Sequence, residues 1–145
     1  MSIGRLETAA AQGASTLLLV WDDGHRATLD LTPIIAAHPV LAPLADAALF
    51  QRVQLSSDGW SLEWPDCEID FGAQQLRRWA DEQSGRAMPR DAFRAWVERH
   101  HFTQDAAAEA LGLSRRTIAY YLSGERPIPR TVLLATHGYD HQQAA

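Results

Sequence analysis

The chain contains no lysine, so all 13 of its basic residues are arginine. We interpret this absence, together with the many alanines, as an effect of genome composition that carries no functional information. Cysteine is almost as scarce, since Cys67 stands alone and cannot form an internal disulfide. A lone thiol is typical of proteins in a reducing compartment, which favours the cytoplasm over secretion.

Long hydrophobic runs are also missing. The longest, Leu17 to Trp21, is far shorter than the roughly 20 apolar residues that cross a bilayer. The first residues lack the apolar stretch of a signal peptide, and neither a phosphate-binding glycine loop nor a hydrolase nucleophile motif occurs. We therefore expect a cytoplasmic protein that does not contact a membrane, is not an enzyme and needs no cofactor.

Charge is divided unevenly along the chain. The whole sequence has a net charge of −5, and residues 1–87 carry 6 arginines and 12 acidic residues, a net charge of −6. Residues 88–145 carry 7 arginines and 6 acidic residues, a net charge of +1. Opposite signs are expected if only the second part approaches the phosphates of a nucleic acid. Ser84-Gly85-Arg86 is the most linker-like stretch, so we predict two domains, residues 1–84 and 85–145.

Alternating hydrophobic residues in the first domain predict an α+β fold, a small antiparallel sheet with short helices. Asp22-Asp23-Gly24 and Ser57-Asp58-Gly59 each supply turn residues between two strands. Thr32 suits the N-cap of a helix and Pro33 its first position, whereas Ala9–Ala14 is expected to be a loose connection. The expected strands are Ile3–Thr8, Leu17–Trp21, His25–Leu31, Arg52–Leu55, Trp60–Trp64 and Cys67–Phe71, and further helices are expected at Leu44–Phe50 and Ala73–Gln83.

The tryptophans mark the expected core. Trp21, Trp60 and Trp64 lie on predicted strands and are expected inside the sheet core, while Trp79 and Trp96 are expected near the domain junction. A tryptophan left partly exposed would mark a surface for a partner.

Turn and core residues that together form a recognisable pattern are spread over residues 3–76. They are Trp21–Gly24, Leu29–Leu31, Pro43–Asp46, Phe50–Val53, Gly59, Glu63–Pro65, and Asp70 ahead of Leu76. In these residues the first domain resembles the bacterial family known as domain of unknown function 2442. Members of that family usually have a glycine soon after the Trp-Pro pair, where this chain has Asp66-Cys67-Glu68. The resemblance implies a small α+β fold without a settled activity, in a family some of whose members lie beside toxin-like partners or carry helix-turn-helix extensions.

The second domain has the spacing of a helix-turn-helix. Thr103 and Ser114 are good N-caps, and Gly112 supplies the left-handed residue that a tight turn requires. Ala108 is small at the place where two steeply crossing helices would touch. Together these residues predict helices at Pro89–His100, Gln104–Leu111 and Arg115–Ser123, the last closed by Gly124.

The segments after the third predicted helix also have features of a helix-turn-helix domain. Ser123–Val132 looks like a connection into a fourth helix, and Ala135–Tyr139 looks like the end of that helix. Over about fifty residues this part resembles the lambda-repressor-like (Cro/Xre) family. The resemblance implies that the third helix enters the major groove of DNA, as in a transcriptional repressor. Because one such helix buries little surface, we expect a homodimer that reads two half-sites about 34 Å apart.

The resemblance also indicates which residues would contact DNA. Arg115 and Arg116 would point outward from the third helix, where an arginine can pair with guanine. Tyr120 would either join them or pack back on Arg116. Gln104 resembles the family glutamine that contacts a backbone phosphate, and Arg126 could add another phosphate contact. The predicted DNA-binding residues are Gln104, Ser114, Arg115, Arg116, Thr117, Tyr120 and Arg126.

Other interpretations of the sequence remain open. The alternative function is an antitoxin-like interaction module, whose first domain binds a cognate protein while DNA binding is secondary. His137 and His141 have a spacing that suits a metal, but they straddle Gly138 and lack a third ligand. Asp22-Asp23 is interpreted as a turn, and Cys67 has no evident base. We therefore predict neither a metal site nor a catalytic residue.

Overall fold

Two hydrophobic cores organise the chain. The computed structural model describes residues 4–144. The chain divides into two compact units, and the boundary between them falls between Ala80 and Asp81, within helix α3 (Ala73–Gln83). Ile3, where the first predicted strand would begin, lies outside the described residues.

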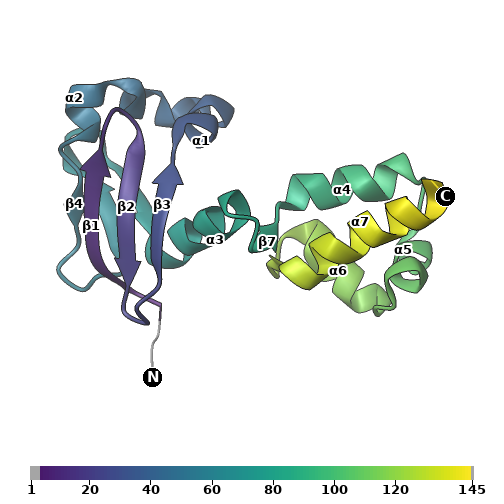
Figure 1. Ribbon diagram of the computed structural model, residues 1–145. Coiled ribbons are helices and arrows are strands. Elements are labelled where there is room, and N and C mark those ends of the chain that lie inside the picture. The colour runs from purple at the N-terminus through teal and green to yellow at the C-terminus, as the bar shows by residue number, and fades with distance from the viewer. Residues whose placement is uncertain (1–3, 145) are drawn as a thin grey trace. The chain divides into compact units, whose positions relative to one another are not determined.

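The first unit has the predicted α+β fold, built from two antiparallel sheets of three strands each. In Figure 1, β1, β2 and β3 form one layer. The first sheet contains β1 (Leu6–Gln12), β2 (Thr16–Trp21) and β3 (Arg26–Asp30), and the second contains β4 (Gln54–Leu55), β5 (Ser61–Trp64) and β6 (Ile69–Gly72). The shorter elements are α1 (Thr32–Ala37), the 3₁₀ turns Pro39–Ala45 and Pro65–Cys67, and α2 (Ala47–Phe50).

Alternation along the strands sends one face of each sheet into the core. Leu17, Leu19 and Trp21 of β2 are buried. The indole Nε1 of Trp21 donates to the carbonyl of Ala73 at 3.0 Å, and that of Trp64 donates to the carbonyl of Phe50 at 3.0 Å. Both tryptophans therefore bury their rings without leaving a polar atom unsatisfied.

Trp60 does not join this core, so its predicted position is wrong. Its side chain is 37% exposed. The ladder with β6 begins at Ser61, and the backbone N–H of Trp60 donates to Asp58 Oδ1 at 3.0 Å. Trp60 thus belongs to the turn, where the inward and outward alternation of the strand does not apply.

Three further expectations for the first unit are corrected. Of the segment predicted as a loose connection, Ala9–Gln12 belongs to β1 and pairs with β2, with Ala10 opposite Leu18, and only the last two residues lie in a turn. Thr32 is the first residue of α1 and not its N-cap, and its hydroxyl lies 2.7 Å from that of Ser15. The helix expected at Leu44–Phe50 is only α2, which Asp46 caps.

The segment after the Trp-Pro pair has a left-handed residue. Glu68 takes φ 56°, a conformation that glycine adopts without steric cost. This is the segment in which the resembled family usually has a glycine, and in this chain Glu68 takes the left-handed conformation.

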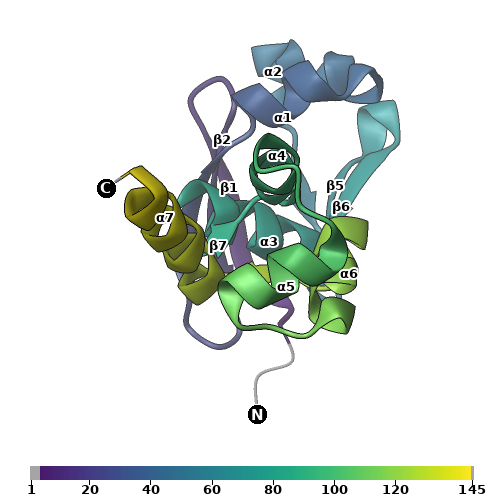
Figure 2. The same ribbon diagram turned by 90° about the vertical axis from the view of Figure 1, so that its right-hand side faces the viewer.

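The second unit is helical, as predicted. It contains α4 (Arg90–Arg99), α5 (Gln104–Leu111), α6 (Arg115–Ser123) and α7 (Arg130–Ala144), and α5 and α6 lie next to each other in Figure 2. A two-stranded ladder that the sequence did not predict joins β7 (Ala87–Met88) to β8 (Ile128–Pro129). The core centres on Phe93, which contacts the rings of Trp96 and Tyr121.

Helix α7 continues beyond its predicted end at Tyr139. Asp140 anchors the added turns to α4: its carboxylate accepts from Trp96 Nε1 at 2.9 Å and from Arg99 Nη2 at 2.7 Å. Nε2 of His100 lies 2.6 Å from the same carboxylate. Partial desolvation raises the pKa of Asp140, but the hydrogen bonds from His100 and Trp96 and the charge of Arg99 outweigh it, so the pKa lies below the ordinary value of 3.8.

We expect Asp140→Ala to lower the free energy of unfolding by about 1–3 kcal/mol at neutral pH, because the buried N–H of Trp96 loses its acceptor. A carboxyl with a depressed pKa stabilises the fold above its unfolded value and loses this contribution as pH falls through the folded value. The difference between the two proteins should therefore narrow below pH 3.8. Urea unfolding of the wild type and of Asp140→Ala at several pH values measures this difference in stability. Glu98→Ala, which removes an exposed acid of α4, should change stability by less than about 0.5 kcal/mol.

Candidate nucleic-acid interface

Helices α5 and α6 form a helix-turn-helix whose ends the sequence predicts residue by residue. The N–H of Ala106 donates to Thr103 Oγ1 at 3.1 Å, and the N–H of Thr117 donates to Ser114 Oγ at 3.1 Å. Gly112 takes φ 70° between the helices, and Ala108 is buried. Both N-caps and the turn glycine are confirmed.

Helix α6 has a buried and an exposed face. Ile118 and Tyr121 are buried in the core of this unit, and Tyr121 is a core residue that sequence reasoning missed. Arg115 and Arg116 are exposed at the beginning of the helix. The inner face therefore fixes the helix while the two arginines extend from the surface.

The first turn of α6 concentrates positive charge. It contains both arginines and no acidic residue. The N-terminus of a helix carries a partial positive charge, so acids are favourable there and arginines are unfavourable, each by about 0.3–1 kcal/mol. Such an arrangement weakens the isolated helix slightly but suits an anion that binds at the N-terminal end of α6.

A stack of three side chains brings Arg126 beside α6. Arg116 Nε donates to the hydroxyl of Tyr120 at 2.7 Å. The guanidinium of Arg126 lies over the ring of Tyr120, 4.2 Å from its centroid, and that of Arg116 lies 5.3 Å from the same centroid. Tyr120 packs against Arg116, one of the two roles predicted for it, and its contact with DNA stays a prediction. Tyr120 thus holds two guanidinium groups near each other on the surface.

The remaining predicted residues have separate settings. Ser114 and Thr117 form the cap of α6, with their hydroxyl oxygens 2.9 Å apart. Gln104 is the first residue of α5 and lies outside the stack. The next residue, Asp105, was not predicted, and its carboxylate lies 3.7 Å from Arg115 Nη1. An acid therefore stands beside one of the two exposed arginines.

Two arginines of α4 hold the far end of α6, and sequence reasoning missed both. Arg90 Nε donates to the carbonyl of Leu122 at 2.7 Å, and Arg94 Nη2 donates to the same carbonyl at 3.0 Å. Carbonyls at the end of a helix lack partners within it and carry partial negative charge, so these bonds are favourable. Their spacing of four residues on one helix was the available signal. Arg90 and Arg94 are positioning residues for α6.

The fold and this surface define a helix-turn-helix protein with an α+β domain attached. Residues 93–135 match the helix-turn-helix family, and residues 8–82 match the family described as protein of unknown function DUF2442. The chain belongs to the DUF2442 family. Both resemblances expected from the sequence are thereby confirmed.

Comparison with solved structures gives a similar protein from Nitrosomonas europaea, described as a candidate DNA-binding protein. The two share 36% sequence identity with a TM-score of 0.54, and the match covers 94% of this chain and 86% of that one. No curated protein matches the chain.

Two further features bear on the site. Among residues 4–144, no group of three or more histidine, cysteine, aspartate or glutamate side chains is placed to hold a metal ion. None of the helices in this part of the chain is long and apolar enough to cross a membrane.

Proposed function

We propose that this protein binds double-stranded DNA sequence-specifically, as a cytoplasmic, homodimeric transcriptional repressor without enzymatic activity. One observation carries the proposal: the exposed first turn of α6 presents Arg115 and Arg116 with no acid among its residues, while the opposite face of the helix is buried. A helix in this position of a helix-turn-helix reads base edges with its N-terminal residues. The DNA-binding description of the Nitrosomonas europaea relative supports the same function.

The side chains divide into two roles. Arg115 and Arg116 face base edges, where arginine pairs bidentately with guanine. Gln104 and Arg126 contact phosphates, which position the domain without reading sequence. Tyr120 keeps Arg126 close to Arg116, so it orders the surface more than it reads a base. The hydroxyls of Ser114 and Thr117 stabilise the start of the helix.

Binding to the DNA upstream of the protein's own gene tests the proposal. Fluorescence anisotropy should give a dissociation constant on the order of 10⁻⁸ M at physiological salt, with shuffled DNA of the same composition bound at least a thousandfold more weakly. Affinity should fall as salt rises from about 50 to 200 mM, because phosphate contacts release counterions. Equal, weak binding to both duplexes would contradict the proposal and favour a protein partner. A reporter driven by the same DNA should be repressed by the intact protein.

Replacing Asp105 with asparagine should tighten DNA binding about two- to fivefold. The exposed pair that Asp105 forms with Arg115 contributes little to folding, but the carboxylate repels phosphates and competes with them for the arginine. Anisotropy titrations of the two proteins at low salt measure the change. Glu98→Gln removes the same charge from α4 and should have a smaller effect. Weaker binding by Asp105→Asn would show that the pair orients Arg115 for DNA.

A further inference from the structure

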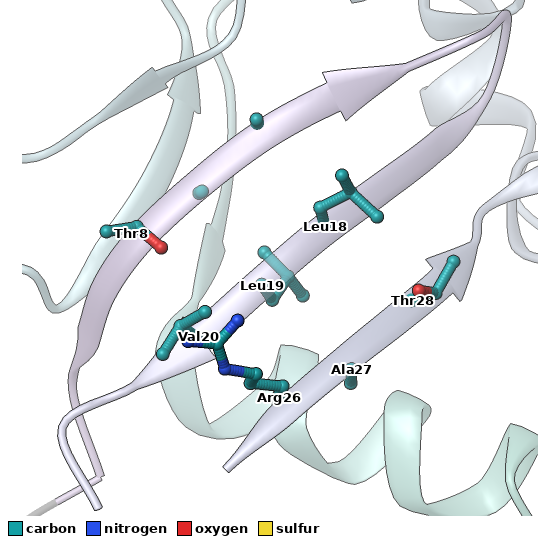
Figure 3. Close-up of a pocket in the computed structure, with 9 residues that line it drawn as sticks. Thr8, Leu18, Leu19, Val20, Arg26, Ala27 and Thr28 are labelled. Carbon is teal, nitrogen blue, oxygen red and sulfur yellow. The ribbon is translucent and has the colours of Figure 1, made fainter. Parts of the chain in front are cut away.

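The outward face of the first sheet is ordered in three rows. The register of β1, β2 and β3 places one residue of each strand in every row. The rows are Thr8–Val20–Arg26, then Ala10–Leu18–Thr28, then Gln12–Thr16–Asp30. Figure 3 shows the first row crossing the strands and Leu18 projecting from the middle of the face.

This face is apolar at its centre and charged at two places. Leu18 is 40% exposed, and it borders a shallow hollow of about 500 Å³. Its row neighbours Ala10 and Thr28 are small, so another surface can approach closely. Arg26 and Asp30 are both exposed, at opposite ends of β3. The N–H of Thr32 donates to Asp30 Oδ1 and lowers the pKa of Asp30 below its ordinary value of 3.8, so this residue is charged at neutral pH.

We propose that this face binds the same face of a second copy of the chain. The two-fold axis lies between the sheets, perpendicular to the strands, along the row Ala10–Leu18–Thr28. Rotation about that axis exchanges the outer rows, so Arg26 of one copy faces Asp30 of the other, and the reverse pair forms as well. Leu18 meets Leu18, which removes the exposed leucine from water.

Of the two simple orientations of the two-fold axis, the one perpendicular to the strands fits the charges of this face. An axis parallel to the strands would place β1 over β3, so that Arg26 would face Thr8 and Asp30 would face Gln12. Only the perpendicular axis pairs both charges. A self-complementary patch is what a closed dimer with two-fold symmetry requires. A nucleic acid is a poorer occupant, because Asp30 would repel its phosphates.

The size of the patch predicts a weak dimer. Strands lie about 4.8 Å apart, and outward residues of one strand are about 6.8 Å apart, so nine residues cover a small area. At roughly 300 Å² per copy, this area is smaller than standard specific interfaces and belongs with weak, transient contacts. We therefore expect association at micromolar concentrations, strengthened when two half-sites hold two copies together. The inference deepens the dimer of the proposed function, but it is tested without DNA, so either can fail alone.

Cross-linking of cysteine variants tests the geometry. In a Cys67→Ser background, Ala10→Cys places a thiol on the proposed axis, opposite its own counterpart. Val40→Cys places one at a residue that is 76% exposed and outside the sheet. At micromolar protein, a short bis-maleimide should cross-link Ala10→Cys at least about tenfold faster than Val40→Cys, because the dimer raises the local thiol concentration. Equal rates would overturn the proposal.

Charge exchange tests the pairing. Arg26→Asp and Asp30→Arg each place like charges opposite one another, so each variant alone should associate at least about tenfold more weakly in sedimentation experiments. An equimolar mixture of the two should regain association, because every facing pair is then of opposite sign. A mixture that stays monomeric would overturn the pairing.

A second pair of variants keeps the test valid if Asp30→Arg does not fold. Asp30→Arg removes the acceptor of the Thr32 N–H, so its fold is checked by circular dichroism. If it does not fold, Arg26→Asp is compared with Arg52→Asp, which makes the same charge change at a residue outside this sheet. Weakened association in Arg26→Asp alone supports the proposal, and equal association of both variants overturns it.

Discussion

Replacing both Arg115 and Arg116 with alanine should lower affinity for the specific DNA site by at least about thirtyfold. Each bidentate arginine–guanine pair contributes roughly 1–3 kcal/mol of discrimination, and every tenfold change in affinity corresponds to about 1.4 kcal/mol. Binding to shuffled DNA should fall much less. The variant should fold as well as the wild type, because both side chains are exposed and alanine favours a helix.

A charge-matched control separates base reading from simple electrostatics. Arg5→Ala/Arg52→Ala also removes two exposed positive charges, but from the first unit. It should change affinity for the specific site by less than about threefold at physiological salt, where exposed charges that do not contact DNA are screened. If the two double variants lose affinity equally, α6 does not read DNA.

Replacing Phe93 with alanine should destabilise the second unit by about 3–5 kcal/mol. Phe93 is fully buried. Its ring centroid lies 6.1 Å from that of Trp96 and 5.6 Å from that of Tyr121, so truncation opens a cavity at the middle of this core. Because Tyr121 belongs to the inner face of α6, DNA binding should be lost together with folded α6.

Calorimetry of a matched pair measures this effect. Phe50 is fully buried in the first unit, where its ring lies 5.7 Å from that of Trp64. Since each unit has its own core, Phe93→Ala should lower one thermal transition and Phe50→Ala the other. Phe50→Ala should leave helical signal and DNA affinity of the second unit largely intact. A single transition shifted equally by both changes would show that the cores are not independent.

The sequence predicts best those features that neighbouring residues determine. Thr103, Gly112 and Ser114 cap or turn the backbone within a few residues of themselves, so the ends of α5 and α6 follow from local chemistry. Helix α3 is predicted for a similar reason, since its apolar residues recur at helical spacing.

Features that depend on distant partners are predicted poorly. Alanine has a low propensity for strands, and Ala9–Ala11 is extended because β2 pairs with it. The last turns of α7 depend on Asp140 meeting Trp96, which lies 44 positions earlier. The ladder between β7 and β8 likewise joins segments that no local pattern connects.

In the candidate site, too, some features follow from neighbouring residues and others depend on residues far away in the sequence. Which residues project from the start of α6 follows from helical periodicity and the position of its cap. That Arg126 stacks on Tyr120, that Asp105 stands beside Arg115, and that Arg90 holds Leu122 are consequences of tertiary packing. These contacts fix how the charged groups are arranged around α6.

Selection of binding sites from a random pool of DNA duplexes tests the central claim most directly, because it requires no knowledge of the genes involved. We predict that the full chain enriches a defined half-site, present twice with centres about 10 base pairs apart, and that Arg115→Ala/Arg116→Ala enriches no such sequence. A pool that stays random with the wild-type protein, or that yields the same sequence with the variant, would contradict DNA reading by α6.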